Sequence, residues 1–242
     1  MGKRTTPSGK RDPLDQLQAD IHNCRACPRL VSWREQVAVE KRAAYRDDTY
    51  WGKPVSGFGD SSAQVLVLGL APAAHGANRT GRVFTGDRSG DWLYRAMHKA
   101  GFANQPNSTD LSDGLTLQNA WVTAAVRCAP PDNKPLPDER NRCLTFLQTE
   151  IQLLRNVSVV VTLGKFAYDV AVKEFAAATK AKFGHGAETS ATNAAGTPIT
   201  ILCSFHPSQQ NTFTGKLTEP MIDAIFNRAR TLTLGSEVLP GK

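Results

Sequence analysis

The sequence predicts an α/β domain with a central, mainly parallel sheet of four strands flanked by helices. Two observations lead to this fold class. Short apolar runs of strand length alternate with longer segments of helical periodicity, and no segment of the chain repeats. Strand-then-helix units favour parallel pairing, because neighbouring parallel strands are joined by a crossover helix. We therefore expect the functional loops at the carboxyl ends of the strands.

The expected elements follow the apolar pattern in order. A helix begins at Pro13 and runs into Cys24, with Leu14, Leu17 and Ile21 on one face. Residues 29–60 form a mixed segment. The expected strands are the apolar runs 65–68, 120–126, 157–163 and 199–204, and the helices after them cover 87–100, 137–155, 165–178 and 218–232.

The composition is that of one globular domain. Of the 242 residues, 40% are apolar and 21% are charged, which excludes global disorder. We assign residues 13–235 to a single domain, 1–12 to a disordered basic tail and 236–242 to a C-terminal tail. No apolar run approaches the roughly 20 residues of a membrane span, and the N-terminus lacks the apolar region of a secretory signal. We expect a cytoplasmic protein without a membrane partner.

The chain carries an excess of positive charge. It has 29 lysines and arginines against 22 acidic residues, a formal net charge of +7. Such an excess favours a polyanionic partner, and nucleic acid is the first candidate. The alternative is a basic protein that binds no polyanion.

Four of the five cysteines are candidate metal ligands. Cys24 and Cys27 form a C-x-x-C pair, Cys128 follows a strand, and Cys143 lies inside a helix. Four thiolates can hold a zinc ion or an iron–sulfur cluster, and this spacing does not choose between them. Buried free thiols are the alternative. Cys203 lies in an apolar run and is interpreted as a small core residue.

Three loops that follow strands carry the polar residues of interest. The first reads GLAPAAHGANRTGRVFTGD over residues 69–87, the second RCAPPDNKP over 127–135, and the third FHPSQQNTFTG over 205–215. Glycines in the first loop allow close approach of a ligand, but the loop lacks both Gly-Lys-Ser/Thr and G-x-G-x-x-G. Nucleotide triphosphates and dinucleotides are therefore disfavoured.

Each polar residue in these loops has a structural alternative when taken alone. His206 after a strand is often a hydrogen-bonded surface residue, Asp87 can cap the helix that follows, and Asn133 can be a turn residue.

Taken together, the C-x-x-C pair and the three loop motifs resemble the uracil-DNA glycosylase superfamily, and within it the fifth, or type B, family. The resemblance runs from about residue 20 to residue 230. It implies a parallel sheet flanked by helices and an N-terminal iron–sulfur segment. The implied ligands of a structural 4Fe–4S cluster are Cys24, Cys27, Cys128 and Cys143.

Two positions depart from the sister family of iron–sulfur uracil glycosylases. That family carries a glutamate where this chain has Leu70, and a uracil-reading asparagine where this chain has Ala124. A pocket without that amide should read pyrimidines less strictly, and the type B family that this chain resembles accepts deaminated purines such as hypoxanthine as well as uracil. The resemblance therefore implies broad specificity.

The resemblance also implies roles for individual residues. Asp87 orients water and stabilises the oxocarbenium ion, and His206 donates to the leaving base. The implied substrate-binding residues are Gly69, Ala71, Ala73, Phe84, Ala124 and Asn133, with Phe84 stacking on the extruded base. Position in or near these loops, rather than the resemblance, gives the candidate DNA contacts, which are Arg79, Arg82, Lys134, Ser208, Gln209, Gln210 and Asn211, with Arg88 and Lys216 as further candidate phosphate contacts. The alternative is that at least half of these cations are only solvated.

The expected activity is hydrolysis of the N-glycosidic bond of uracil and other deaminated bases in DNA. We expect a monomeric, monofunctional glycosylase that flips the base out of the duplex and leaves an abasic site. Two alternatives remain open: a non-catalytic, cluster-bearing DNA-binding protein on the same fold, and a zinc-stabilised hydrolase of free nucleosides.

Overall fold

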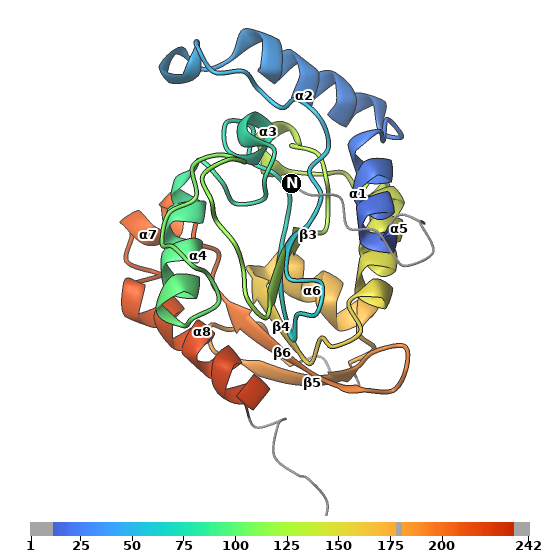
Figure 1. Cartoon of the computed structure of the whole chain (residues 1–242), viewed down its shortest axis with the longest axis vertical. Helices are drawn as coiled ribbons and strands as arrows, with labels where there is room; N and C mark the ends of the chain where they lie inside the picture. The colour runs from blue at the N-terminus through green and yellow to red at the C-terminus, as the bar shows by residue number, and fades with distance from the viewer. Residues whose placement is uncertain (1–11, 178–180, 235–242) are drawn as a thin grey trace, which may run out of the picture.

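The computed structural model describes residues 12–177 and 181–234 (Figure 1). Of the predicted tails, only Asp12 lies within the described residues. Asp12 caps the first helix, α1 (Pro13–His22), because its side chain accepts a hydrogen bond from the backbone N–H of Leu14 at 2.8 Å. The remaining residues of both tails, and the predicted end of the helix 165–178, lie outside the described ranges.

A mixed sheet of six strands forms the centre of the molecule, in the order β1-β3-β2-β4-β6-β5. Its four middle strands are parallel and correspond to the predicted ones: β2 (Val65–Gly69), β3 (Ala120–Ala124), β4 (Val159–Leu163) and β6 (Pro198–Ser204). The α/β class and the parallel core are thus confirmed.

The expected strand number of four was wrong, because two antiparallel strands close the edges of the sheet. β1 (Phe58–Gly59) has two residues and pairs with β3. β5 (Glu188–Thr192) pairs with β6 and alternates exposed and buried side chains. Neither segment contains an apolar run, and this is why apolar runs alone did not reveal them.

Helices cover both faces of the sheet (Figure 1). On one face lie α1, α5 (Pro137–Leu153) and α6 (Lys165–Glu174), which share a buried apolar cluster with Leu66, Val160 and Ile201 of the strands. On the other face, α4 (Arg88–Lys99) and α8 (Glu219–Leu234) bury a second cluster. Each face of the sheet therefore has its own apolar core.

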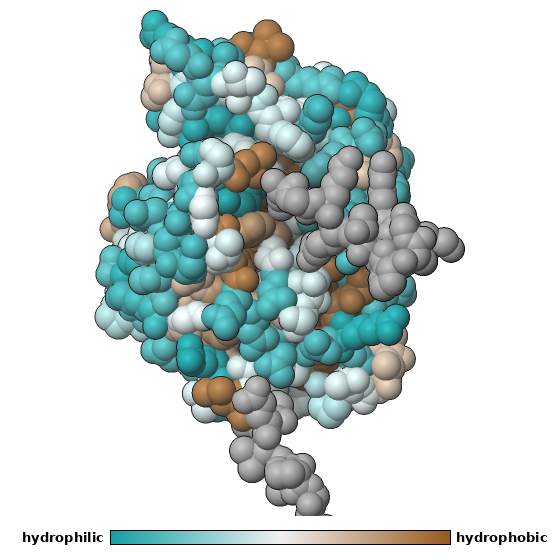
Figure 2. Space-filling view, in the orientation of Figure 1, coloured by the Kyte–Doolittle hydropathy of each residue, from teal (hydrophilic) through white to brown (hydrophobic). Residues whose placement is uncertain are grey.

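The remaining helices lie at one end of the sheet. Figure 1 shows α2 (Pro28–Glu40) crossing above the short α3 (Ala77–Thr80). Two single turns, η1 (Ala43–Tyr45) and η2 (Pro131–Asn133), and the short α7 (Gln209–Phe213) complete the connections. Within the described residues, no helix is long and apolar enough to cross a membrane. On the face shown in Figure 2 most residues are hydrophilic, with apolar residues between them in the middle of the view and a few at its edges.

Candidate active site

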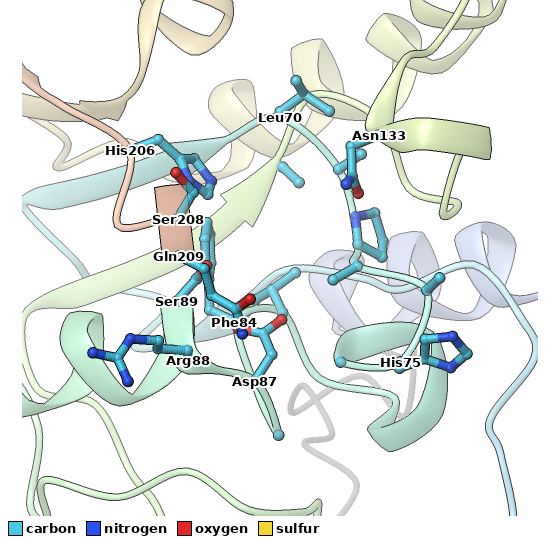
Figure 3. Close-up of a pocket in the computed structure, with 18 of the residues that line it drawn as sticks. Leu70, His75, Phe84, Asp87, Arg88, Ser89, Asn133, His206, Ser208 and Gln209 are labelled. Carbon is cyan, nitrogen blue, oxygen red and sulfur yellow. The ribbon is translucent and has the colours of Figure 1, made fainter. Parts of the chain in front are cut away.

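A cavity of about 630 Å³ opens at the carboxyl ends of the parallel strands (Figure 3). Residues from the loops after β2, β3 and β6 line it, as expected from the strand order. The predicted residues that line this cavity are Ala71, Ala73, Phe84, Asp87, Ala124, Asn133, His206, Ser208, Gln209 and Gln210, together with Arg88. The structure thus brings Asp87 and His206 into one cavity large enough for a nucleobase.

Asp87 is held rigidly at the start of α4. It is the N-cap of this helix, and its Oδ1 accepts a hydrogen bond from the backbone N–H of Gly90 at 3.0 Å. Burial raises the pKa of this carboxyl, while the backbone N–H groups of Ser89 and Gly90 act in the opposite direction. The helix end and these N–H groups act against the effect of burial, and Asp87 combines the capping role with a carboxyl group at the cavity wall.

Two glycines provide the space that Asp87 and Phe84 occupy. A Cβ added at Gly76 would lie 2.1 Å from Asp87 Oδ2, and one added at Gly69 would lie 2.6 Å from the ring of Phe84. Phe84 itself has a φ of 51°, in the left-handed region that a bulky residue rarely adopts. Close packing against these two glycines therefore restricts the positions of the ring and of the carboxylate in the loop after β2.

His206 follows β6 and reaches the cavity from the side opposite Asn133 (Figure 3). Its ring centre lies 6.0 Å from that of Phe84, and its backbone carbonyl accepts a hydrogen bond from Asn211 Nδ2 at 2.8 Å. Burial lowers the pKa of His206 to about 4. The imidazole is therefore neutral near pH 7 and offers one N–H donor.

Asn133 is presented by a tight turn. Both Asp132 and Asn133 have positive φ values, 53° and 56°, and they end the single turn η2. Asparagine and aspartate tolerate this conformation better than most residues. Asn133 therefore lies in a turn and also lines the cavity, and its contact with the base stays a prediction.

Several predicted contact residues do not face the cavity. Arg82 is only 3% exposed and bonds to Thr85, Ser108 and Asp113, so the prediction that it contacts DNA phosphates is wrong. Arg79 is bound by Asp48 at 2.6 Å and by two backbone carbonyls, which occupies its guanidinium within the protein.

Other predicted residues lie beside the cavity without lining it. Gly69 makes room for Phe84 and is not among the residues that line the cavity, so its role in substrate binding stays a prediction. The amide of Asn211 supports the His206 backbone. Lys134 is exposed, and the Nζ of Lys216 lies 5.1 Å from the ring centre of Phe205. DNA contacts by these lysines stay predictions.

The structure adds residues to the site that the loop motifs did not single out. Arg42, Tyr45 and His75 line the cavity on the side of η1. His75 Nδ1 lies 3.0 Å from the hydroxyl of Tyr50, and burial and the nearby Arg42 lower the His75 pKa. His75, in the motif of residues 69–87, was the one feature of the three loop motifs that pointed to this wall of the cavity.

An exposed aromatic side chain stands beside the cavity on α7. Phe213 is 68% exposed, and the guanidinium of Arg88 lies over its ring at 4.4 Å from the centre. Arg88 directly follows Asp87, and its Nε donates to Thr212 Oγ1 at 3.3 Å. The exposed ring is therefore anchored next to the cavity entrance.

The four predicted ligand cysteines lie near one another, between α1, α2, the end of β3 and α5. Cys27, Cys128 and Cys143 contact one buried apolar cluster, and Cys24 is close enough to influence the pKa of the other three thiols. In the described part of the chain, all five cysteines are free, and no group of histidine, cysteine or acidic side chains is arranged to hold a metal ion. The 4Fe–4S cluster stays a prediction.

The surroundings of these thiols fit a negatively charged sulfur cluster. The backbone N–H of Arg127 donates to Cys143 Sγ at 3.2 Å, and Arg34 donates to Cys128 Sγ at 2.9 Å. The Nε of Arg34 is buried and has no acceptor within the described residues. N–H groups directed at sulfur are a feature of iron–sulfur sites, where they stabilise the anionic ligands.

Known proteins are similar in sequence to this chain over most of its length. A sequence model of the uracil DNA glycosylase superfamily matches residues 56–230. The chain is 51% identical to the Type-5 uracil-DNA glycosylase of Mycobacterium tuberculosis, over 93% of this chain and 84% of that protein. It is 46% identical to the Type-5 uracil-DNA glycosylase of Thermus thermophilus, over 86% of this chain and 93% of that protein.

A Type-4 uracil-DNA glycosylase of Thermotoga maritima is more distant, at 27% identity over 82% of this chain and 83% of that protein. The chain therefore belongs to the uracil DNA glycosylase superfamily. Within the superfamily it is a member of the type-5 family, as the resemblance predicted.

Proposed function

We propose that the protein is a monofunctional DNA glycosylase that hydrolyses the N-glycosidic bond of uracil and other deaminated bases, hypoxanthine included, and leaves an abasic site. The observation that carries this proposal is the shared cavity of Asp87, Phe84 and His206. The names of the type-5 relatives support action on uracil in DNA. We infer that it acts as a monomer on DNA.

The two polar groups suit the two ends of the scissile bond. Breaking the bond between the sugar and the base leaves positive charge at C1′ and negative charge on the departing base. Asp87 supplies the anion for the sugar and an acceptor that orients the attacking water. His206, as a neutral imidazole, donates an N–H to a carbonyl oxygen of the base, where negative charge accumulates.

Hydrolysis by water is favoured over attack by an amine. A bifunctional glycosylase needs an amine nucleophile that forms a Schiff base with the sugar. No lysine is among the described residues that line the cavity. This supports the monofunctional assignment.

The wall that faces the base has few groups that read its identity. Leu70 and Ala124 line the cavity and offer no side-chain hydrogen bond, and Phe84 offers a stacking surface. The amide of Asn133 serves as donor or acceptor. A wall of this kind accepts both uracil and hypoxanthine. Both bases have a carbonyl oxygen for the donor, and the wall has no side-chain donor and acceptor pair that matches only one of them.

We assign DNA binding to residues at the entrance of the cavity. Arg88 provides positive charge, and Ser208, Gln209 and Gln210 border the cavity from α7 and its N-cap. Extruding a base from a duplex costs a few kcal/mol, and an apolar side chain can fill the space that the base leaves. We assign this part to Phe213, whose ring is mostly exposed and lies against the guanidinium of Arg88.

We further propose that Cys24, Cys27, Cys128 and Cys143 hold a 4Fe–4S cluster. When bound, the cluster would supply four metal–thiolate links between the N-terminal helices and the core. Its ligands do not line the cavity, so the proposed role is structural.

An excision assay on oligonucleotides tests the function. We expect alkali-labile abasic sites in DNA that contains uracil, hypoxanthine or xanthine, and little product from oxidised bases. Salt-sensitive binding without base release would favour a non-catalytic DNA-binding protein. Activity on free nucleosides and not on DNA, with zinc in the purified protein, would favour the nucleoside hydrolase.

A further inference from the structure

Arg34 is a buried cation, and among the described residues the one carboxylate within ion-pair distance of it is shared with Arg25. It lies on α2 and is only 2% exposed. The nearest acidic oxygen, on Glu35, lies 3.8 Å from its NH2, and Glu35 is 43% exposed and bound by both guanidinium nitrogens of Arg25. Burying a cation costs several kcal/mol unless an anion or several acceptors compensate it.

The direct partners of the Arg34 guanidinium belong to two of the four clustered cysteines. Its NH1 donates to Cys128 Sγ at 2.9 Å, and its NH2 donates to the backbone carbonyl of Cys24 at 3.2 Å. Its Nε is buried and finds no acceptor within the described residues. Neutral thiols are weak acceptors and cannot balance a full positive charge, whereas ligated thiolates can.

We propose that Arg34 is the buried counter-charge of the cysteine-ligated cluster, and that it sets the reduction potential of the cluster and slows the loss of iron. This inference rests on the proposed 4Fe–4S cluster. Hydrogen bonds to the sulfurs and nearby charge are among the factors that set the potential of such clusters. A cation beside the cluster favours the added electron, so removing it makes reduction harder.

The backbone of the same residue reaches the catalytic loop. The carbonyl of Arg34 accepts a hydrogen bond from Asn78 Nδ2 at 3.2 Å, and Asn78 is completely buried in α3. α3 is part of the loop that runs from β2 to Asp87. Arg34 therefore contacts the cysteine cluster through its side chain and the loop that positions the carboxylate through its backbone, so a side-chain substitution removes only the contacts with the cluster.

The test compares Arg34→Met and Arg34→Lys with the full-length wild type. Each protein is purified without oxygen, and iron content, visible absorbance, reduction potential and the rate of iron release to a chelator are measured. We expect Arg34→Met to have a more negative potential and to release iron about tenfold faster or more, as the loss of a charged hydrogen bond implies. Arg34→Lys keeps the charge and should recover much of both properties.

Arg25→Met is the matched control, because it removes an arginine that lies between Cys24 and Cys27 in the sequence. Its side chain is 62% exposed and its guanidinium pairs with Glu35. It should match the wild type in potential and iron release. If Arg34→Met binds iron with the potential and release rate of the wild type, Arg34 is not the counter-charge. If the wild type itself holds no iron, the cluster proposal fails, and with it this inference, while the excision assay remains an independent test of the glycosylase.

Discussion

Replacement of Asp87 by asparagine removes one charge from the cavity and preserves the local fold. Asparagine caps a helix about as well as aspartate, so the hydrogen bond from the Gly90 N–H to Asp87 Oδ1 has an equivalent in the variant. The two side chains also have nearly the same volume, which matters because the backbone of Gly76 packs against the carboxylate. The melting temperature should therefore change little.

The expected loss of activity follows from the charge alone. A carboxylate about 4 Å from the developing cation at C1′ contributes up to about 4 kcal/mol at an effective dielectric constant of about 20. This energy corresponds to about three decades of rate. We expect Asp87→Asn to lower single-turnover excision of uracil by two or more decades, with DNA binding nearly unchanged.

The control is Asp91→Asn, which removes an exposed carboxylate from the same first helical turn. Its excision rate should stay within a few-fold of the wild type. Excision by Asp87→Asn at close to the wild-type rate would remove Asp87 from the catalytic role. An equal loss in Asp91→Asn would show that the general charge of the helix end, rather than the position of Asp87, is responsible.

Three further predictions follow from the cavity and its entrance. Burial lowers the pKa of His206 from 6.5 to about 4, so its neutral form stabilises the fold above pH 6.5 and this contribution is lost as the pH falls toward 4. Between pH 7 and pH 5, the free energy of unfolding in urea should fall by about 2 kcal/mol less in His206→Gln than in the wild type. An equal fall in the two proteins would contradict the buried neutral imidazole. Ala124→Asn should lower the ratio of hypoxanthine to uracil excision, because it adds an amide to the wall that faces the base; a ratio equal to that of the wild type would contradict our account of specificity. Phe213→Ala should slow excision from duplex DNA about tenfold and leave single-stranded DNA nearly unaffected, and Phe213→Leu should retain most duplex activity. The control is Leu234→Ala, which removes an exposed apolar side chain at the far end of α8. If Phe213→Ala lost as much activity on single-stranded DNA as on duplex DNA, a role of Phe213 in base extrusion would be excluded.

The parallel core was predictable because its strands are buried on both faces and form unbroken apolar runs, such as residues 65–68. The edge strands were not, because β1 is too short and β5 alternates in burial. Arginines near the loops were predicted as phosphate contacts from their position in the chain. Arg82 shows the limit of that reasoning, since a positive charge in a loop motif can equally be bound inside the protein by Asp113.

The amino-acid sequence by itself determined which segments form the parallel sheet and which loops end at one edge of it. Both properties depend on local apolar patterns and on the chain order of strands and helices. Only the tertiary structure decided which polar side chains in those loops are free to meet a ligand. Arg79 and Arg82 are occupied by partners within the protein, whereas Arg42 and His75 line the cavity. The physical reason is that exposure and ion pairing depend on contacts between residues distant in the chain, such as Arg34 and Cys128, and local sequence does not encode them.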